Sequence, residues 1–377
     1  MSVAGIIFSN LHDSSIPELT RRRTMASIPF GCRYRLIDFP LSNMVNSGIS
    51  NICVIAHTNY QSLMDHIGSG KDWDLARRSG GIRLLPPFMN AAGNLIGSQL
   101  YSTRMEAMLS VQSSLSEIKE DYVILSDCDV ICNIDLNDLL KDHIAHGADI
   151  TIAVKRVKVE EMGERNIYLK SDADGNLTDI LTHSKLKTRA ADLNLNIWVV
   201  NREYLIHALE NAAAHGYRSF TQDILRRNLK NDKFRVYCYD GYFADISSLE
   251  EYYARSMDLL KDPAARVSLF GNAERPIFTQ RRNSSPTQHG SAARVRNSLI
   301  ADDCMIEGTV ENSLIFRGVH IARGAIVRNS ILMADTYVGA GARLNCVITD
   351  MDVSIRDGIE LSGHETLPFY LDKGRHL

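Results

Sequence analysis

The loop after the first apolar run of the sequence carries many polar side chains but no glycine. It extends from Ser9 to Thr24 and reads SNLHDSSIPELTRRRT. In an α/β sheet, ligands bind beyond the carboxyl ends of the strands, so this loop is the first place to look for chemistry. A backbone that approaches phosphates closely needs glycine, because a Cβ would obstruct the approach. The sequence therefore predicts that this loop does not cradle a triphosphate in the usual way.

Arginines crowd the segment around and after this loop. Five lie between residues 21 and 35, and two more form a pair far along the chain: Arg21, Arg22, Arg23, Arg33, Arg35, Arg281 and Arg282. Guanidinium groups bind phosphate and carboxylate groups through paired hydrogen bonds, so the cluster is a candidate anion site. The alternative is a solvated basic surface, with Arg35 in structural ion pairs and residues 281–282 in a flexible polar linker.

The elements that would position these groups alternate between strands and helices up to about residue 261. Apolar runs rich in β-branched residues predict strands at 51–57, 121–131, 148–157 and 194–200. Segments of helical period predict helices at 102–118 and 136–147, and a further helix that begins with a capping box at Ser248 and stops before Pro263. This alternation predicts a Rossmann-like α/β domain, a mostly parallel sheet with helices on both faces.

A repeat dominates the last part of the chain. The motifs NSLI, NSLI, NSIL and NCVI begin at Asn297, Asn312, Asn329 and Asn345. Aliphatic residues recur near every sixth position, as in Ile315, Ile321, Val327 and Met333. This period predicts a left-handed parallel β-helix of hexapeptide repeats, whereas antiparallel hairpins, the alternative, do not explain a fixed period. We expect an N-terminal domain at 1–262, a polar connector at 263–293 and the β-helix at 294–377.

Composition narrows the class of protein. A chain of 377 residues predicts two domains, and a net charge of −3 argues against a nucleic-acid partner. There is no apolar run of membrane-spanning length and no secretory signal pattern, so no membrane partner is expected. The seven cysteines include no C-x-x-C pair. We expect free thiols and a cytoplasmic protein.

Several segments resemble the sugar-nucleotide pyrophosphorylases, specifically the bacterial glucose-1-phosphate adenylyltransferases. They are IPFGCRYRLIDFPLSNMVNSGISNICVI from Ile28, SFTQDIL from Ser219, GYFADISSLEEYYARSMDLL from Gly241, and the repeats EGTVENSLIFRGVHIARGAIVRNSILM from Glu307. The resemblance covers nearly the full chain, with both domains in order. It implies that the phosphate of glucose-1-phosphate attacks the α-phosphate of ATP, which releases pyrophosphate and forms ADP-glucose for glycogen. It also implies Mg²⁺, lysine and arginine as the groups that neutralise charge.

The chain departs from the family pattern where relatives stabilise the transferred phosphate. The replaced positions are Asn10 and Leu11 for a glycine pair, Ser15 for the loop arginine, Met25 for a lysine, and Arg104 for a small residue that contacts the nucleotide. The Glu-Lys-Pro run that grips the sugar phosphate has no counterpart, and only Lys185 and Lys187 are loose candidates for this role. Together these changes remove most of the expected transition-state stabilisation.

The resemblance also places Cys128 where the family has a metal-holding aspartate. A thiol is a poor ligand for Mg²⁺, which prefers oxygen. Asp127 and Asp129 flank it as weak candidates for a rearranged metal site, since neighbours in a strand point to opposite faces. The second metal aspartate of the family is retained as Asp245.

These losses, with an intact fold, resemble the GlgD-type partner subunits of the family. The resemblance implies a catalytically deficient regulatory subunit that needs no cofactor itself and forms a heterotetramer with a catalytic paralogue that uses Mg²⁺. The family's effector sites imply that a sugar phosphate binds among these arginines: Arg33, Arg35, Arg23, Arg281 and Arg282. Two alternatives stay open, an active ADP-glucose-forming nucleotidyltransferase with a rearranged Mg²⁺ site and a stand-alone sugar-phosphate sensor.

Overall fold

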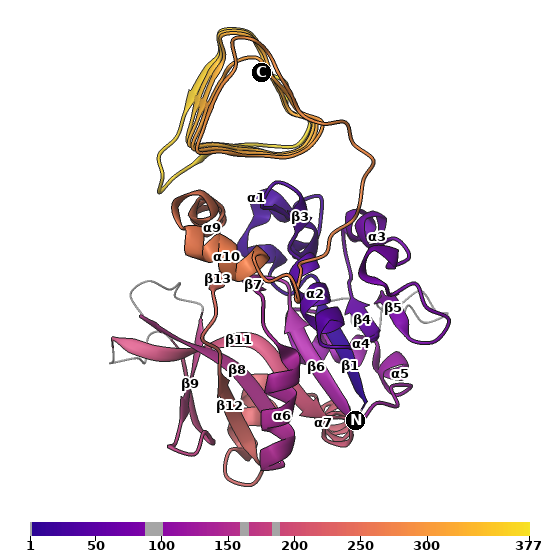
Figure 1. The fold of residues 1–377 in the computed structure, drawn as a ribbon. Helices are drawn as coiled ribbons and strands as arrows, with labels where there is room; N and C mark the ends of the chain where they lie inside the picture. The colour runs from indigo at the N-terminus through magenta and orange to yellow at the C-terminus, as the bar shows by residue number, and fades with distance from the viewer. Residues whose placement is uncertain (1, 87–100, 159–165, 183–188) are drawn as a thin grey trace.

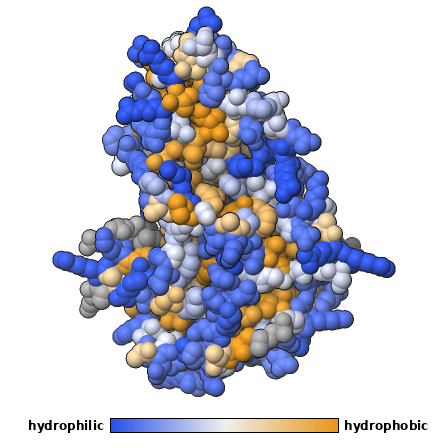
Figure 2. Space-filling model, in the orientation of Figure 1, coloured by the Kyte–Doolittle hydropathy of each residue, from blue (hydrophilic) through white to orange (hydrophobic). Residues whose placement is uncertain are grey.

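The computed structural model describes residues 2–86, 101–158, 166–182 and 189–377. An α/β domain carries the amino terminus, and a triangular β-helix lies against one end of it (Figure 1). Within the described ranges, no helix combines the length and the apolar character that crossing a bilayer requires. Apolar surface gathers on the β-helix and in smaller patches on the α/β domain, while most of the visible face is hydrophilic (Figure 2).

The α/β domain is built on a nine-stranded mixed sheet. Its parallel half has the order β5–β4–β1–β6, formed by Gly81–Leu85, Asn51–Ile55, Val3–Phe8 and Tyr122–Asp127. The other half contains β8 (Ile150–Lys158), β9 (Ile167–Ser171), β10 (Leu177–Thr182), β11 (Ala190–Asn201) and β12 (Phe234–Cys238). There β11 runs antiparallel to β6, β8 and β9, while β8 and β12 pair in parallel. The mostly parallel sheet predicted from the sequence is therefore limited to the half around β1, because short turns such as that between β9 and β10 impose antiparallel pairing.

Helices cover both faces of this sheet, as expected. One face packs against α2 (Asp38–Asn46), α3 (Gln61–Ile67) and α6 (Leu136–His146). The other packs against α4 (Arg104–Ser110), α5 (Gln112–Leu115), α7 (Arg202–His215) and the π-helical segment Phe220–Leu225, which leads into α8 (Arg226–Asn228). The helix predicted at 102–118 is thus divided at Val111, whereas the predicted end of α6 at Gly147 is confirmed by its left-handed φ of 56°.

Shorter elements connect the sheet to the β-helix. They are α1 (Pro17–Thr20), the hairpin β2 (Pro29–Phe30) and β3 (Tyr34–Arg35), the pair β7 (Val130–Cys132) and β13 (Phe243–Asp245), α9 (Leu249–Lys261), α10 (Pro263–Phe270), and 3-10 turns at Asp13–Ser15, Met25–Ser27 and Lys71–Trp73. The Ser248 hydroxyl accepts a hydrogen bond from the backbone N–H of Glu251, which confirms the predicted cap of α9.

The predicted left-handed parallel β-helix is confirmed, and every strand pairing within it is parallel, which excludes the hairpin alternative. Its first sheet comprises β14 (Gln288–His289), β17 (Met305–Ile306), β20 (His320–Ile321), β23 (Tyr337–Val338) and β26 (Ser354–Ile355). The second comprises β15 (Arg294–Arg296), β18 (Thr309–Glu311), β21 (Ile326–Arg328), β24 (Arg343–Asn345) and β27 (Glu360–Ser362). The third comprises β16 (Leu299–Ile300), β19 (Leu314–Ile315), β22 (Ile331–Leu332), β25 (Val347–Thr349) and β28 (Phe369–Leu371). Ile315, Ile321, Val327 and Met333 are all fully buried.

The register of the last repeat differs from the sequence alignment by one residue. Asn297, Asn312 and Asn329 adopt a left-handed backbone, with φ of 43°, 47° and 46°, and the equivalent residue of the next coil is Cys346, with φ 52°, not Asn345. Asparagine tolerates this conformation better than most residues. The side chains still form a ladder, since Asn329 Nδ2 donates to Asn345 Oδ1 at 2.9 Å.

The segment between the domains contains more structure than the sequence pattern indicated. Residues 263–270 form α10, and β14 already pairs with β17 of the β-helix. Residues 271–287 contain no helix or strand. The two residues of β14 are exposed, so the β-helix begins without the apolar pattern that identifies its later coils.

The two domains share an apolar interface. Phe316, Met333 and Ile348 of the β-helix belong to one buried cluster with Met25 and Tyr252 of the α/β domain. A cluster that joins distant parts of the chain in this way resists separation, because opening it exposes apolar surface to water. The β-helix therefore restrains the segment that follows the glycine-free loop.

Candidate functional site

The candidate site lies at the carboxyl ends of β1 and β6. These strands are parallel neighbours, and Phe8, the last residue of β1, pairs with Asp127, the last residue of β6. The loop that leaves β1 and the turn that carries Asp129 therefore begin at the same edge of the sheet. This is the edge at which α/β folds place ligands.

Two cationic side chains occupy the space beside these carboxylates. His12 Nε2 lies 2.9 Å from Asp127 Oδ2 and 3.3 Å from Asp129 Oδ2. From the other side, Arg104 Nε donates to Asp127 Oδ1 at 3.0 Å, and Arg104 Nη2 lies 2.9 Å from Asp127 Oδ2. Three of the four carboxylate oxygens of Asp127 and Asp129 thus face a nitrogen of the protein itself.

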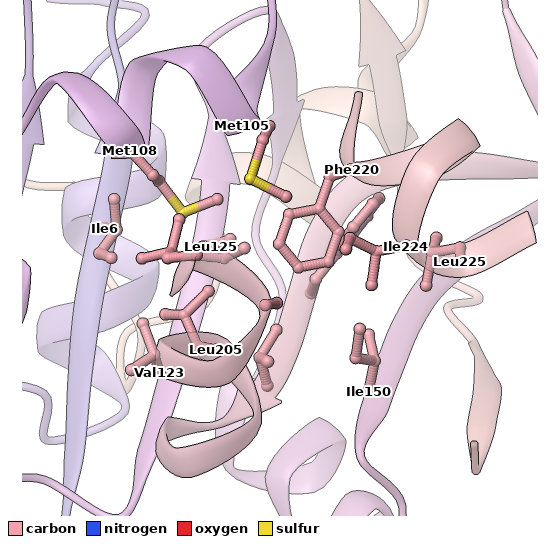
Figure 3. Close-up of a cluster of buried hydrophobic side chains, with 14 of the residues drawn as sticks. Ile6, Met105, Met108, Val123, Leu125, Ile150, Leu205, Phe220, Ile224 and Leu225 are labelled. Atoms are coloured by element: carbon pink, nitrogen blue, oxygen red, sulfur yellow. The ribbon is translucent and has the colours of Figure 1, made fainter. Parts of the chain in front are cut away.

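The fold holds Arg104 in this place. It is the first residue of α4, whose amino end is capped by Thr103 through the N–H of Glu106. Met105 and Met108 of α4 point into the same apolar cluster as Leu125 and Phe220, which fixes the helix on the sheet (Figure 3).

The guanidinium group of Arg104 is further confined by its surroundings. Its central carbon lies 4.6 Å from the ring centre of Trp198 and 5.8 Å from that of Phe8, a cation–π contact with each ring. Nη2 also donates to the carbonyl of Asn196 at 2.8 Å. Only 8% of Arg104 is exposed, so water does not compete for these contacts.

The charges in this cluster shift one another's pKa values. Burial alone would lower the pKa of His12, but Asp129 and Asp127 outweigh it and raise the pKa to about 9. Burial would raise the pKa of Asp127, but Arg104 and His12 hold it below its ordinary value. Burial and the nearby Asp127 raise the pKa of Asp129 despite His12. At neutral pH, His12 is a cation, and Asp127 is an anion paired on two sides.

Cys128 and Asp245 occupy different positions in the site. The Cys128 side chain belongs to the apolar cluster on the face of the sheet covered by α2, α3 and α6, and burial raises its thiol pKa well above the ordinary value. Asp245 is the last residue of β13. The backbone N–H of the following residue, Ile246, donates to the carbonyl of Asp129 at 2.9 Å. Burial and the charge of Asp129 raise the pKa of Asp245 to about 7.

The glycine-free loop is closed by its own hydrogen bonds. Asn10 Nδ2 donates to Asp13 Oδ2 at 2.6 Å, and Asn10 Oδ1 accepts the N–H of His57 at 3.1 Å. Asp13 Oδ1 accepts the N–H of Met25 at 2.7 Å, and burial raises the pKa of Asp13 to about 6. These contacts turn the polar groups of the loop inward instead of toward a ligand.

The side chains at the other replaced positions also contact the protein itself. Leu11 packs against the apolar cluster beneath α4, and the Met25 side chain is buried in the interface between the domains. Ser15 ends the 3-10 turn that begins at Asp13. Lys185 and Lys187, the loose candidates for the sugar phosphate, lie outside the described residues.

As arranged, these residues do not fit Mg²⁺. One ligand atom from each of His12, Asp127 and Asp129 lies within 4.8 Å of the others, a spacing that suits a metal ion. However, a protonated imidazole has no free lone pair for a metal, and Arg104 engages both oxygens of Asp127. Asp245 is not part of this cluster of ligand atoms.

A second site lies between the domains. A cavity of about 220 Å³ is lined by four arginines, Arg33 and Arg35 from the hairpin, Arg282 from the connecting segment and Arg317 from the β-helix, with Asp335 as its one carboxylate among the described residues. Burial and the charges of Arg33 and Arg282 lower the pKa of Arg317. Burial, Arg23 and Arg282 likewise lower the pKa of Arg35 to about 10, in spite of Asp38. The guanidinium groups therefore repel one another, which favours the binding of an anion.

Two of the arginines predicted to bind an anion lie elsewhere. Arg23 is buried and forms an ion pair with Asp350 of the β-helix, with Nη2 at 2.6 and 2.9 Å from the two carboxylate oxygens. Arg281 is exposed and lines a separate cavity with Lys71 and Trp73. Neither Arg23 nor Arg281 lines the cavity with Arg33, so a role for these two residues in an anion site stays a prediction.

Sequence reasoning missed two residues of these sites. His12 was visible in the loop, but no sequence signal indicated that the loop folds back onto Asp127 and Asp129. Arg317 lies in a β-helix coil and reaches the cavity only because the two domains dock. Arg104 was noted as too bulky for its place, and this bulk was the available sign that a cation fills the site.

Comparisons with known proteins agree with this architecture. Residues 15–262 match the family described as Nucleotidyl transferase, and residues 284–366 match the family described as GlmU-like, C-terminal hexapeptide. The glycogen biosynthesis protein GlgD of Bacillus subtilis is 31% identical over 372 residues, which cover 98% of this chain and 95% of that protein. The glucose-1-phosphate adenylyltransferase of Geobacillus stearothermophilus is 33% identical over 320 residues, 84% of this chain and 80% of that enzyme. That of Fervidobacterium nodosum is 30% identical over 368 residues, 96% of this chain and 86% of that enzyme. The chain therefore belongs to the nucleotidyl transferase family, is similar to GlgD and to glucose-1-phosphate adenylyltransferases, and carries a C-terminal hexapeptide domain.

Proposed function

We propose that this chain is a catalytically deficient regulatory subunit, which tunes the synthesis of ADP-glucose for glycogen by a catalytic glucose-1-phosphate adenylyltransferase paralogue in the cytoplasm. The observation that carries the proposal is the filling of the carboxylate site by His12 and Arg104. Phosphoryl and nucleotidyl transfer depend on positioning and on neutralising developing charge with metal ions. Carboxylates that the protein has already neutralised leave little to hold a metal–nucleotide complex.

The similarity to GlgD and to several glucose-1-phosphate adenylyltransferases supports the choice of pathway and partner. The similarity to GlgD extends over 98% of this chain and so over both domains, and surfaces for assembly would be kept while the catalytic positions implied by the family resemblance are changed. We propose a heterotetramer with the catalytic paralogue. Contacts within it would shift the partner toward its active state, with a coupling of about 1–3 kcal/mol, or about 5- to 150-fold in affinity.

The cavity between the domains supports an effector role. Within the described parts of the chain, the guanidinium groups of Arg33, Arg35 and Arg282 form no carboxylate pair, and that of Arg35 donates only to Ser62. The cavity is smaller than the pockets of about 300–1,000 Å³ that hold drug-sized ligands, so a small anion such as a sugar phosphate suits it. Because arginines from both domains line it, a bound phosphate would hold the domains together.

Pyrophosphate release from ATP, glucose-1-phosphate and Mg²⁺ tests the proposed function. The assay compares this chain alone, the catalytic paralogue alone and the co-expressed pair. We expect no turnover above background for the chain alone, and a pair whose activity differs from that of the paralogue by several-fold. Identical kinetics for the paralogue with and without this chain would contradict the regulatory role.

One observation favours a second candidate, an active nucleotidyltransferase with a rearranged Mg²⁺ site. The ligand atoms of His12, Asp127 and Asp129 are close enough to share a metal ion. In that case the chain alone would release pyrophosphate, and Asp245→Ala would abolish the release. The third candidate, a stand-alone sugar-phosphate sensor, would bind a hexose phosphate but neither co-purify with a paralogue nor change its kinetics.

A further inference from the structure

The site at the ends of β1 and β6 holds an arginine and a histidine in direct contact with two carboxyl groups. A divalent cation bound between these two carboxyl groups would contact the same oxygens that Arg104 and His12 contact here. We infer that Arg104 and His12 are resident counter-ions, which take the place of a divalent cation between Asp127 and Asp129, and that their removal converts the cluster into a divalent-cation site. This inference gives a physical cause for the proposed lack of turnover, and it rests on that part of the proposed function.

The contacts show how completely these cations occupy the place of a metal. Asp127 accepts a hydrogen bond from Arg104 Nε and lies 2.9 Å from Arg104 Nη2, while His12 Nε2 approaches one oxygen of each carboxylate, at 2.9 and 3.3 Å. A single atom that approaches one oxygen of each of two carboxylates is the arrangement that a bridging cation would adopt. Here that atom is a histidine nitrogen.

Arg104 is held too firmly to move aside for a metal. Its guanidinium group contacts a carboxylate, the carbonyl of Asn196 and two aromatic rings, and its helix is packed on the sheet. A mobile surface arginine could leave when a metal–nucleotide complex arrives. This buried one would lose several contacts at once, with water excluded from the place it leaves.

The same geometry indicates that a cation would bind once these side chains are removed. Asp127 and Asp129 are 3% and 5% exposed. Asp245 lies near Asp129, because the backbone N–H of Ile246, the residue after Asp245, donates to the carbonyl of Asp129. Asp129 Oδ1 is buried without a hydrogen-bond partner in the described structure, so it is a free oxygen ligand. Buried carboxylates without counter-ions repel one another, and a hard divalent cation with a preference for oxygen relieves that repulsion.

The test uses Mn²⁺ as a paramagnetic probe for the full-length chain without any partner. The variants are the double change His12→Gln with Arg104→Met, the same pair combined with Asp129→Asn, and Arg77→Met, a matched loss of an exposed arginine that pairs with Asp74. Electron paramagnetic resonance titration measures free Mn²⁺, and thermal unfolding with and without Mg²⁺ gives an independent reading. Methionine retains the apolar stem of Arg104 against the rings.

We expect a single saturable Mn²⁺ site in the double variant, at least about tenfold tighter than any binding by the wild-type chain or by Arg77→Met. Asp129→Asn should abolish it, and Mg²⁺ should raise the melting temperature of the double variant only. If the double variant folds only when Mn²⁺ is present, that dependence supports the inference. If it does not fold under either condition, Arg104→Met alone decides, because it frees Asp127 Oδ1 near the unpaired Asp129 Oδ1, and it should still bind Mn²⁺ at least about tenfold more tightly than the wild type.

Wild-type binding as tight as that of the double variant would overturn the inference, and so would a folded double variant that binds no Mn²⁺. Neither result depends on a catalytic paralogue. A failure here therefore differs from a failure of the regulatory function, which shows only as unchanged kinetics of the pair.

Discussion

Replacing His12 by glutamine should change the pH dependence of folding stability in a defined direction. The pKa of His12 is about 9 in the folded chain against an ordinary value of 6.5. A group whose folded pKa is raised contributes stability that is fully present below its unfolded pKa. That contribution is lost as the pH rises through the folded pKa. The stabilising effect of His12 is therefore complete below pH 6.5 and disappears as the pH passes about 9.

The size of this effect follows from the two pKa values and from solvent exposure. The difference between the pKa values corresponds to an upper limit of about 3.4 kcal/mol. One third of the His12 side chain is exposed, at 33%, so water screens its attraction to the carboxylates. We therefore expect a contribution of about 1–2 kcal/mol at pH 6.5 and below.

Urea unfolding of the wild type and of His12→Gln, at a series of pH values from about 6 to about 9.5, measures this contribution. The difference in unfolding free energy between the two proteins should shrink by about 1–2 kcal/mol across that range. Asp245, with a pKa of about 7, titrates in both proteins, so comparing them reduces its effect. A difference that stays constant with pH, or that grows toward pH 9.5, would refute the proposed charge on His12.

Three further changes test other parts of the structure. Asp350→Asn leaves the buried Arg23 without its counter-ion and should cost about 3–5 kcal/mol in urea unfolding, whereas a loss below about 1 kcal/mol would show that the pair is not structurally important. Arg317→Ala should weaken the binding of a hexose phosphate, measured by calorimetry, by about tenfold, while Arg281→Ala, which lines a separate cavity, should leave it unchanged. Cys128→Asp should restore no pyrophosphate release and should destabilise the chain by several kcal/mol, because the new carboxylate would lie in an apolar cluster; turnover by this variant would contradict the placement of Cys128.

Much of the fold could be predicted because its signals are local and periodic. Aliphatic residues recur about every six residues, as in Ile315 and Ile321, because each side of a coil has that length. This period identified the β-helix directly. Gly147 and Ser248 marked helix ends through backbone conformation and capping, which also depend on few neighbours. The direction of β11 was not predictable in this way, because pairing between strands distant in sequence leaves no local pattern.

The candidate site could be located from the sequence only in part. Asp127 and Asp129 lie within the apolar run at 121–131 that predicts a strand, and period-two alternation places both on the side away from Cys128. The positions of His12 and Arg23 depend instead on how the loop between Ser9 and Thr24 folds back. Their partners lie 115 and 327 residues away in the sequence, so no local pattern indicates these pairs.

The presence of Asp127 and Asp129 in a site that we propose to be inactive has a physical explanation in the charges around them. Without a counter-charge, these two carboxyl groups would be buried beside one another, which costs several kcal/mol. Arg104 and His12 supply that counter-charge from within the chain, and each depends on the carboxylates in turn. Once such a network exists, changing any one member leaves the others unpaired, so the cluster persists as part of the folded core. A single substitution toward the family pattern, such as Arg104→Ala, should therefore destabilise the chain before it restores any chemistry.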